Sequence, residues 1–288
     1  VLVAGAGGSS AVAAIRALDG DALDVFSADA DPHAPGLCLV GEDRRLPVSK
    51  GRGDSYTESV YELCERHRID VLIPAVDREL LLLASARVFF AEIGTRIVLP
   101  SEKTLRMCLD KWALHRRCDG TVGMPDSMLV GEDFDPSHPK LPVIVKPRAA
   151  GGSRQVQLIE RREELERIDR DGSLLVQEHL PGAEYSLATL ARSDGKVIAV
   201  VPWARSHGTS RVAASAHIVR DGGLEKIGRQ IAARIGLTSL ASIQVKGSSD
   251  GNLALLKVNP YFTKTMPLAA TSGVNLLKLC IDDLLPDD

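Results

Sequence analysis

The feature that most constrains the fold is a lysine placed between a short apolar run and a glycine-rich loop. Residues 143–145 (Val-Ile-Val) predict a buried strand, and Lys146 leads from it into Pro-Arg-Ala-Ala-Gly-Gly-Ser. Gly151 and Gly152 allow the backbone to approach an anion closely, and Lys146 and Arg148 supply positive charge. Lys-Pro and Gly-Gly-Ser also occur in plain surface hairpins, so the pattern alone leaves open a phosphate site or an ordinary turn.

A second apolar segment follows and ends in polar residues. Residues 174–176 predict another strand, which continues into Gln-Glu-His-Leu at 177–180, a Pro-Gly turn, and Glu-Tyr-Ser at 184–186. Together with the lysine and the glycine loop, this order of motifs resembles the ATP-grasp superfamily. The resemblance is greatest to members similar to the large subunit of carbamoyl-phosphate synthase, and it runs over nearly the whole chain.

Composition narrows the class of protein. The chain has 288 residues, 44% of them hydrophobic, and a formal net charge of −3, which predicts a soluble protein of about two domains. No apolar run approaches the roughly 20 residues of a membrane helix, and the first residues predict a strand rather than a signal peptide, so we expect a cytoplasmic location and no membrane contact. Without a basic run, no nucleic-acid partner is expected. Five widely spaced cysteines predict neither a disulfide framework nor a zinc site.

Strand and helix patterns alternate over the first 100 residues, which predicts a parallel sheet. The opening strand ends in a glycine turn at Gly5, Gly7 and Gly8, and the next one, at 23–28, is followed by Asp29. A dinucleotide site and a plain turn are both open interpretations. The spacing Gly-x-Gly-Gly lacks the third glycine of the dinucleotide fingerprint and favours the plain turn.

The segment Ile-Pro-x-x-Asp-x-Glu-Leu at 73–80 resembles the pre-ATP-grasp domain of carbamoyl-phosphate-synthase-like ligases. In open sheets, ligands bind at the carboxyl ends of strands, so Asp77 and Glu79 are candidate substrate-binding residues. Capping of the following helix is the alternative for both carboxylates. Further along, Ser101 begins a predicted helix that continues to Cys118 and carries an Asp-Lys pair at 110–111.

The resemblance implies a mixed α/β and α+β architecture. A Rossmann-like pre-ATP-grasp domain is expected at 1–100 and an ATP-grasp domain at 101–288, with lobe A at about 119–180 and lobe B at about 181–288. ATP would lie between the lobes, with Lys111 and Lys146 near its phosphates, the 177–180 hinge at adenine and Glu184 at the ribose. The implied cofactor-binding residues are Lys111, Lys146, Arg148, Gly151, Gly152, Ser153, Gln177, Glu178, His179, Leu180 and Glu184.

The remaining patterns predict the second lobe. Strands at 186–191 and 197–201 flank an Asp-Gly turn at 194–195, and a helix is expected at 224–235. A further strand pair is predicted at 241–245 and 253–258. A last helix near 273–285 is expected to complete this lobe.

ATP-grasp ligases transfer the γ-phosphoryl group of ATP to a carboxylate, and an amine then displaces the phosphate. The crowded charges require a divalent metal such as Mg²⁺, held in the family by a residue on one strand and by a Glu and an Asn two apart on the next. Here these positions are Gln244, Lys257 and Asn259. Gln244 and Asn259 are candidate ligands, but an ammonium cannot ligate Mg²⁺ and would repel it, so Lys257 makes use of the metal doubtful.

Other charged positions also depart from the family pattern. Tyr261 stands where an arginine is usual, Ala188 where an acidic residue is expected, and Trp203 where an arginine is common. Three explanations remain open. Lys257 replaces the charge of the metal, with Lys264 and Arg205 as candidate catalytic cations; or phosphoryl transfer is lost; or Glu184, Gln244 and another carboxylate hold a single Mg²⁺.

We expect an ATP-dependent carboxylate–amine ligase that acts through an acylphosphate. The alternative is a degenerate ATP-grasp protein that binds a nucleotide or phosphorylated metabolite without phosphoryl transfer, or that serves other chemistry. The partners expected are a small-molecule carboxylate and an amine, bound between the N-terminal domain and the loop that carries Tyr261 and Thr263. A homodimer is the default expectation for such an enzyme.

Overall fold

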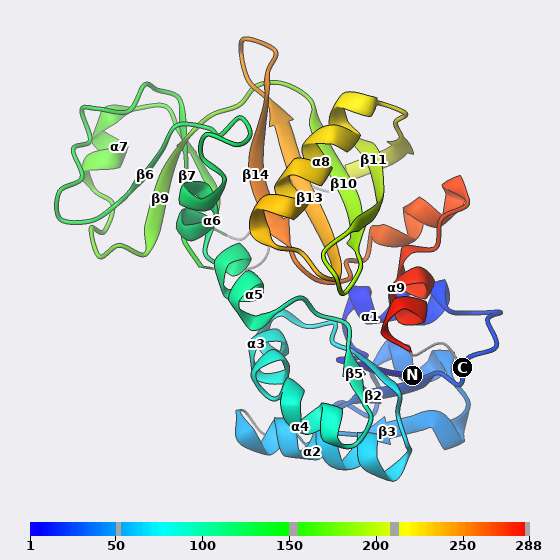
Figure 1. The fold of residues 1–288 in the computed structure, drawn as a ribbon. Coiled ribbons are helices and arrows are strands. Elements are labelled where there is room, and N and C mark those ends of the chain that lie inside the picture. Colours follow the sequence, from blue (N-terminus) through cyan, green and yellow to red (C-terminus); the bar gives the residue numbers. More distant parts are fainter. Residues whose placement is uncertain (50–52, 150–154, 208–212, 286–288) are drawn as a thin grey trace.

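The protein is described here from a computed structural model that covers residues 1–49, 53–149, 155–207 and 213–285. Figure 1 shows a domain built on a parallel sheet below two antiparallel sheets that lie side by side. Within the described residues, no helix has the length and apolar character needed to cross a membrane.

The N-terminal domain confirms the predicted parallel sheet. Its strand order is β3-β2-β1-β4-β5, and every neighbouring pair is parallel. The short strand β3 and the turns η1 and η2 were not predicted, because three residues carry too little periodicity to be recognised. The elements are β1 (Leu2–Ala4), α1 (Ser9–Ala17), β2 (Phe26–Asp29), η1 (Pro35–Leu39), η2 (Glu42–Arg44), β3 (Arg45–Pro47), α2 (Asp54–Arg66), β4 (Val71–Ile73), α3 (Asp77–Ser85), α4 (Arg87–Glu92) and β5 (Arg96–Ile97).

The single helix predicted from Ser101 to Cys118 is wrong. The chain forms α5 (Glu102–Leu109) and α6 (Lys111–Cys118), which are separated at Asp110. Asp110 has extended backbone angles (φ −98°, ψ 104°), and its carboxylate accepts hydrogen bonds from the backbone N–H groups of Trp112 and Ala113. Aspartate stabilises a helix more as an N-cap than as an interior residue, and that preference places the break here.

The sheet of lobe A has the order β6-β9-β7-β8, and its strand pairs are antiparallel. Its own apolar cluster includes Val130, Val145, Leu165 and Val176. The elements are β6 (Ser127–Leu129), β7 (Val143–Pro147), β8 (Gln157–Ile159), α7 (Arg162–Glu166) and β9 (Leu174–Glu178). Strands β7 and β9 correspond to the two apolar segments that the sequence predicted.

Lobe B is an antiparallel sheet of order β12-β11-β10-β13-β14, with α8 across one face. Leu187, Ile243 and Val258 pack with α8 in one cluster, which leaves the residues that alternate with them on the opposite face. Both predicted strand pairs are confirmed. The elements are β10 (Glu184–Ala191), β11 (Val197–His207), β12 (Ala213–Ile218), α8 (Gly222–Ile235), β13 (Leu240–Gly247) and β14 (Leu253–Asn259).

The C-terminal helix does not belong to the second lobe alone. After η3 (Met266–Ser272), α9 (Leu276–Leu284) packs in a cluster that joins α1 and β1 of the N-terminal domain to β10 and β13. Figure 1 shows α9 beside α1, and the Asn275 side chain donates a hydrogen bond of 2.6 Å to the Ala17 carbonyl. The apolar spacing of a helix predicts that one face is buried, but not which element covers that face.

Two glycines lie where the chain enters and leaves lobe A. Gly123 precedes β6, and its carbonyl accepts a hydrogen bond of 2.8 Å from the Leu255 N–H of β14. Gly182 follows β9 and donates to the Gly247 carbonyl at the end of β13 (2.9 Å). A Cβ atom at Gly182 would lie 2.7 Å from that oxygen, and one at Gly123 would overlap the Leu253 carbonyl oxygen. Both crossings therefore require glycine for close contact between backbones.

We expect Gly123→Ala to lower the free energy of unfolding by about 1–3 kcal/mol, because the new methyl group must push back the backbone of β14. Urea unfolding followed by circular dichroism would measure the change. Gly131→Ala is the matched control, since a Cβ atom there meets nothing within 4 Å. An equal loss of stability in the two variants would contradict this explanation.

Candidate functional site

A polar row of residues crosses the face of lobe B that lies opposite α8. Ser186 pairs with Gln244, and Gln244 pairs with Lys257, so their side chains point to the same side of the sheet. Ser242 and Asn259 form the next row in the same way. The structure therefore brings together the three positions that the family uses for metal, which come from β13 and β14.

Lys146 is a buried lysine at the end of β7 in lobe A. It ends the apolar part of β7, is 8% exposed, and donates a hydrogen bond of 2.6 Å to the Gln177 Oε1 atom of β9. Gln177 in turn donates to the Ser127 hydroxyl of β6 (3.0 Å), which donates to the Pro125 carbonyl (2.9 Å). These successive hydrogen bonds hold the Lys146 ammonium through neutral groups: an amide, a hydroxyl and a backbone carbonyl.

The N-terminus of α6 is fastened to the end of β7. The Lys111 ammonium donates to the Pro147 carbonyl (2.8 Å), and the Lys111 N–H donates to the Arg148 carbonyl (3.1 Å). Arg148 forms a forked ion pair with Asp110, at 3.0 Å from Nε and 2.7 Å from Nη2. Arg148 was expected to bind phosphate; its guanidinium is instead already engaged by the carboxylate that caps α6.

Lys111, Lys146 and Lys257 act on one another electrostatically. The pKa of Lys146 is lowered to about 7, chiefly by burial and then by the charges of Lys111 and Lys257. Burial also lowers the pKa of Lys111, followed by the charge of Lys257, while Asp110 opposes the shift. These cations come from α6, β7 and β14, so positive charge from both lobes converges on one place. Such a concentration of partly desolvated positive charge favours a bound anion.

The predicted hinge lies at the end of β9. Leu180 is buried, and Glu178, His179 and Glu184 are partly exposed. Glu178 is held by Asp126, whose N–H donates to the Glu178 carboxylate (3.2 Å) and whose carbonyl accepts from the Glu178 N–H (2.8 Å). Glu184 begins β10 beside the polar row.

Several predicted residues lie outside what the structure describes. Gly151, Gly152 and Ser153 are among them, and of Arg205 only the backbone, in β11, is described. Lys264 is exposed in the loop after β14. In the same loop, the Thr263 and Thr265 hydroxyls lie 3.3 Å apart.

Two candidate substrate residues that are far apart in sequence meet in the structure. The Tyr261 hydroxyl lies near the Asp77 carboxylate at the start of α3. Burial, followed by this carboxylate, raises the pKa of Tyr261. Tyr261 also packs against the apolar cluster of the N-terminal domain. The residue that replaces the family's arginine therefore joins the end of β14 to the N-terminal domain.

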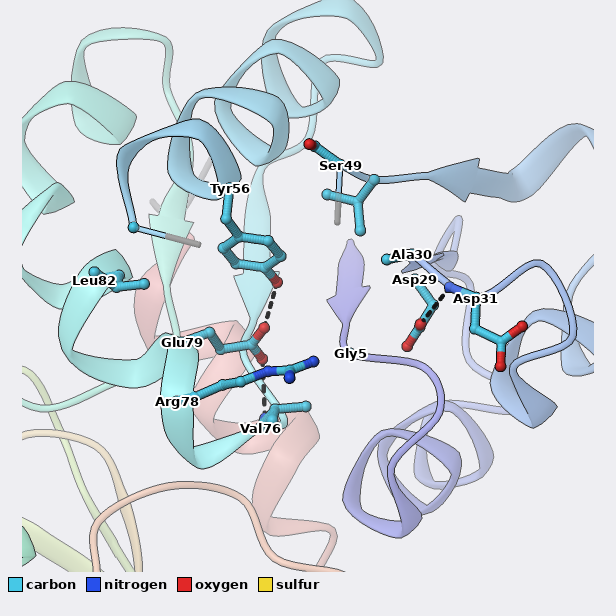
Figure 2. Close-up of a pocket in the computed structure, with 12 residues that line it drawn as sticks. Gly5, Asp29, Ala30, Asp31, Ser49, Tyr56, Val76, Arg78, Glu79 and Leu82 are labelled. Atoms are coloured by element: carbon cyan, nitrogen blue, oxygen red, sulfur yellow. Dashed lines mark hydrogen bonds between the residues drawn. The ribbon is translucent and has the colours of Figure 1, made fainter. Parts of the chain in front are cut away.

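A cavity of about 640 Å³ opens at the carboxyl ends of the parallel strands. Glu79, a candidate substrate-binding residue, lines this cavity, and its carboxylate is also bound by the protein itself. The Glu79 Oε1 atom accepts from the N–H groups of Ala75 (2.7 Å) and Val76 (2.9 Å), and the Tyr56 hydroxyl donates to Oε2 (Figure 2). Burial raises the pKa of Glu79, although these hydrogen bonds oppose the shift. These contacts agree with the capping alternative, in which the Glu79 carboxylate binds backbone N–H groups at the start of α3.

Charged groups of opposite sign stand on two sides of the cavity. Figure 2 shows Arg78 reaching from α3 toward Gly5, with Asp29 and Asp31 beyond. Among the residues that the structure describes, the Arg78 side chain makes no ion pair or hydrogen bond. The Asp29 carboxylate accepts from the Gly7 N–H (2.7 Å) and the Asp31 N–H (2.9 Å). The Gly7 N–H, which would face the pyrophosphate of a dinucleotide, already donates to the Asp29 carboxylate. The negative charge of that carboxylate would repel a pyrophosphate, which argues against the dinucleotide interpretation.

The sequence did not single out Arg78, Tyr56 or Ser127. Arg78 lies between Asp77 and Glu79 in the sequence. Its place beside these two candidate substrate-binding residues was the one local indication that it could also line a site. Tyr56 and Ser127 act through partners that are distant in sequence, and no local pattern identifies such contacts.

Two family models match the chain. Residues 1–98 match "PylC-like, N-terminal domain", and residues 170–287 match "ATP-grasp in the biosynthetic pathway with Ter operon". Among curated proteins, the chain is 32% identical over 108 residues to the D-alanine--D-alanine ligase of Thermotoga sp. (strain RQ2). That match covers 36% of this chain and 36% of the ligase, so the chain matches about a third of the length of this relative.

Solved structures resemble the whole chain. The biotin carboxylase domain of Hydrogenobacter thermophilus 2-oxoglutarate carboxylase, solved with MgADP, ADP and bicarbonate, has a TM-score of 0.78 at 16% identity and matches 99% of this chain and 69% of its own. The L-amino acid ligase of Bacillus licheniformis has a TM-score of 0.75 at 16% identity and matches 100% and 74%. The chain therefore has the ATP-grasp fold, with an N-terminal domain similar to that of PylC-like proteins.

Proposed function

We propose that this protein is an ATP-dependent ligase that joins a carboxylate to an amine through an acylphosphate. The observation that carries the proposal is the convergence of Lys111 and Lys146 on the cleft between two lobes of an ATP-grasp fold. The names of similar proteins, D-alanine--D-alanine ligase and L-amino acid ligase, support a ligase reaction. A closer relationship to carbamoyl-phosphate synthase rests on the Asp77 and Lys111 motifs of the sequence and is part of the proposal.

In this proposal, Lys111 and Lys146 hold the phosphates, because ammonium groups are point charges that suit them. The 177–180 segment reads adenine mainly through its backbone, and Glu184 accepts hydrogen bonds from the ribose hydroxyls. A carboxylate oxygen of the first substrate attacks the γ-phosphorus, and ADP leaves with the bridging oxygen. The amine then attacks the acyl carbon, phosphate leaves with its oxygen, and the nitrogen loses a proton. Lys264 and Arg205 are the proposed cations at the transferred phosphoryl group.

We further propose that the N-terminal cavity holds an amino-acid-like substrate. Arg78 suits a carboxylate, Asp29 and Asp31 suit an ammonium group or hydroxyls, and about 640 Å³ is ample for such a molecule. The Asp77–Tyr261 contact lies beside Arg78 in sequence and connects this region to β14. The amino-acid substrates in the names of similar ligases support this substrate class.

A second candidate function is favoured by Lys257. If phosphoryl transfer has been lost, the protein binds a nucleotide or phosphorylated metabolite without turnover. Such a protein would bind ATP in the same cleft but release no ADP with any substrate.

The ligase proposal predicts ADP release that depends on substrate. ATP, Mg²⁺ and pairs of amino acids would be supplied, ADP followed by a coupled assay, and the joined product identified by mass spectrometry. Lys146→Met should lower the rate by about 100-fold or more, because one preorganised phosphate contact is lost. Lys226→Met, at an exposed position of α8, is the control. Proven ATP binding with no ADP release for any pair would favour the second candidate function.

The cavity proposal predicts that Arg78→Ala raises KM for the amino-acid substrate by about 10-fold or more, because a charged hydrogen bond is lost. The kcat value should change less, since Arg78 would bind the ground state and transition state alike. Arg66→Ala, at the exposed end of α2, is the matched control. An unchanged KM in Arg78→Ala would remove the cavity from the substrate site.

The phosphate role of Lys146 predicts proton uptake when ATP binds. With a pKa of about 7 in the free protein, Lys146 is largely neutral at pH 8, and phosphates would favour its charged form. Calorimetric titrations at pH 8 in buffers of different ionisation enthalpy should show uptake approaching one proton. The uptake should fall toward pH 6, where Lys146 is already charged, and should be lost in Lys146→Met. No uptake at pH 8 would contradict this role.

A further inference from the structure

The residues at the family's metal positions do not fit a divalent cation. Gln244 and Lys257 face each other across β13 and β14, and Asn259 lies two residues further on the same side. The amide oxygens of Gln244 and Asn259 can ligate Mg²⁺, but an ammonium has three donors and no acceptor. Its full positive charge, placed between the two amides, would also repel the ion.

The idea that other carboxylates complete a metal site finds no support in the part of the chain that the structure describes. No group of three or more His, Cys, Asp or Glu side chains there could hold a metal ion. The Asp110 carboxylate acts on Lys111, and it is bound by Arg148 and caps the N-terminus of α6. Glu184 lies near the polar row, but it would be a single carboxylate beside Lys257.

The charge that a metal would bring is instead present as a third lysine. Lys257 acts on both Lys111 and Lys146, so its ammonium lies in the same region as theirs. Lys146 is buried and held by the neutral Gln177 amide, and Lys111 is held by a backbone carbonyl. Three ammonium groups that lower one another's pKa in this way favour an anion of high charge among them.

We propose that Lys257 replaces the divalent cation in charge, so that Lys111, Lys146 and Lys257 bind the triphosphate of ATP directly and without metal. This inference rests on the proposed nucleotide site between the lobes. Lys257 reaches the phosphates from β14, where the family's glutamate would hold the ion, and Gln244 and Asn259 donate their amide N–H groups to phosphate oxygens. The ligand class is a metal-free nucleoside triphosphate.

The first test is calorimetric titration of ATP into the full protein, once with excess Mg²⁺ and once with EDTA. We expect similar affinity in both, or tighter binding in EDTA. Binding that weakens by about tenfold or more in EDTA would overturn the inference and leave the proposed function standing. No binding in either condition would remove the nucleotide site itself, and with it the proposed function.

The second test restores the carboxylate. Lys257→Glu should weaken ATP binding in EDTA by about tenfold or more, and Mg²⁺ should recover much of that loss. Lys226→Glu makes the same charge change on the exposed side of α8, across the sheet, and should leave the ratio of the two affinities unchanged.

Lys257→Met tests the loss of positive charge alone, because it removes the ammonium without introducing a negative group that would repel phosphate. It should also lose affinity in EDTA, but Mg²⁺ should restore less of it than in Lys257→Glu. Circular dichroism would verify that each variant is folded. Folded Lys257→Met with unchanged affinity in EDTA would overturn the role of Lys257, whatever the behaviour of the glutamate variant.

Discussion

The burial of the Lys146 ammonium is the constraint on which the rest of the site depends. A cation that is 8% exposed, with a neutral amide as its partner, is costly to desolvate. The surrounding structure holds it there through Gln177 and Ser127 on one side and through α6, fastened to β7 by Asp110 and Arg148, on the other. The structure therefore holds a buried ammonium in place before any anion binds, and its burial lowers the pKa of Lys146.

The Asp77–Tyr261 contact gives the departures from the family pattern a structural meaning. The tyrosine that stands in place of an arginine lies near a carboxylate of the N-terminal domain and packs on its core. Two positions at the end of β14 thus differ in charge from the pattern that the resemblance implies: Lys257 adds a cation near Lys111 and Lys146, and Tyr261 lacks one.

The sequence predicted the parts of the fold that are encoded locally. The parallel sheet, the two strand pairs of lobe B and the position of Lys146 at the end of a buried strand all follow from apolar periodicity and turn residues. The break at Asp110 was missed because a helical pattern continues on both sides of it, although an aspartate before a new turn was a usable capping signal. The placement of α9, the capping role of Glu79 and the meeting of Asp77 with Tyr261 depend on contacts between distant segments, which no local pattern contains.

Lobe A is joined to the rest of the molecule by backbone contacts rather than by a shared apolar cluster. The N-terminal domain and lobe B share a continuous apolar cluster through α9, whereas lobe A has a cluster of its own. The chain enters lobe A at Gly123, which rests on the backbone of β14, and leaves it at Gly182, which rests on the end of β13. The N-terminus of α6 is a third attachment, because α6 packs with lobe B while Lys111 and Asp110 bind the Pro147 carbonyl and Arg148 at the end of β7. These three attachments together set how far Lys146 stands from the polar row of lobe B.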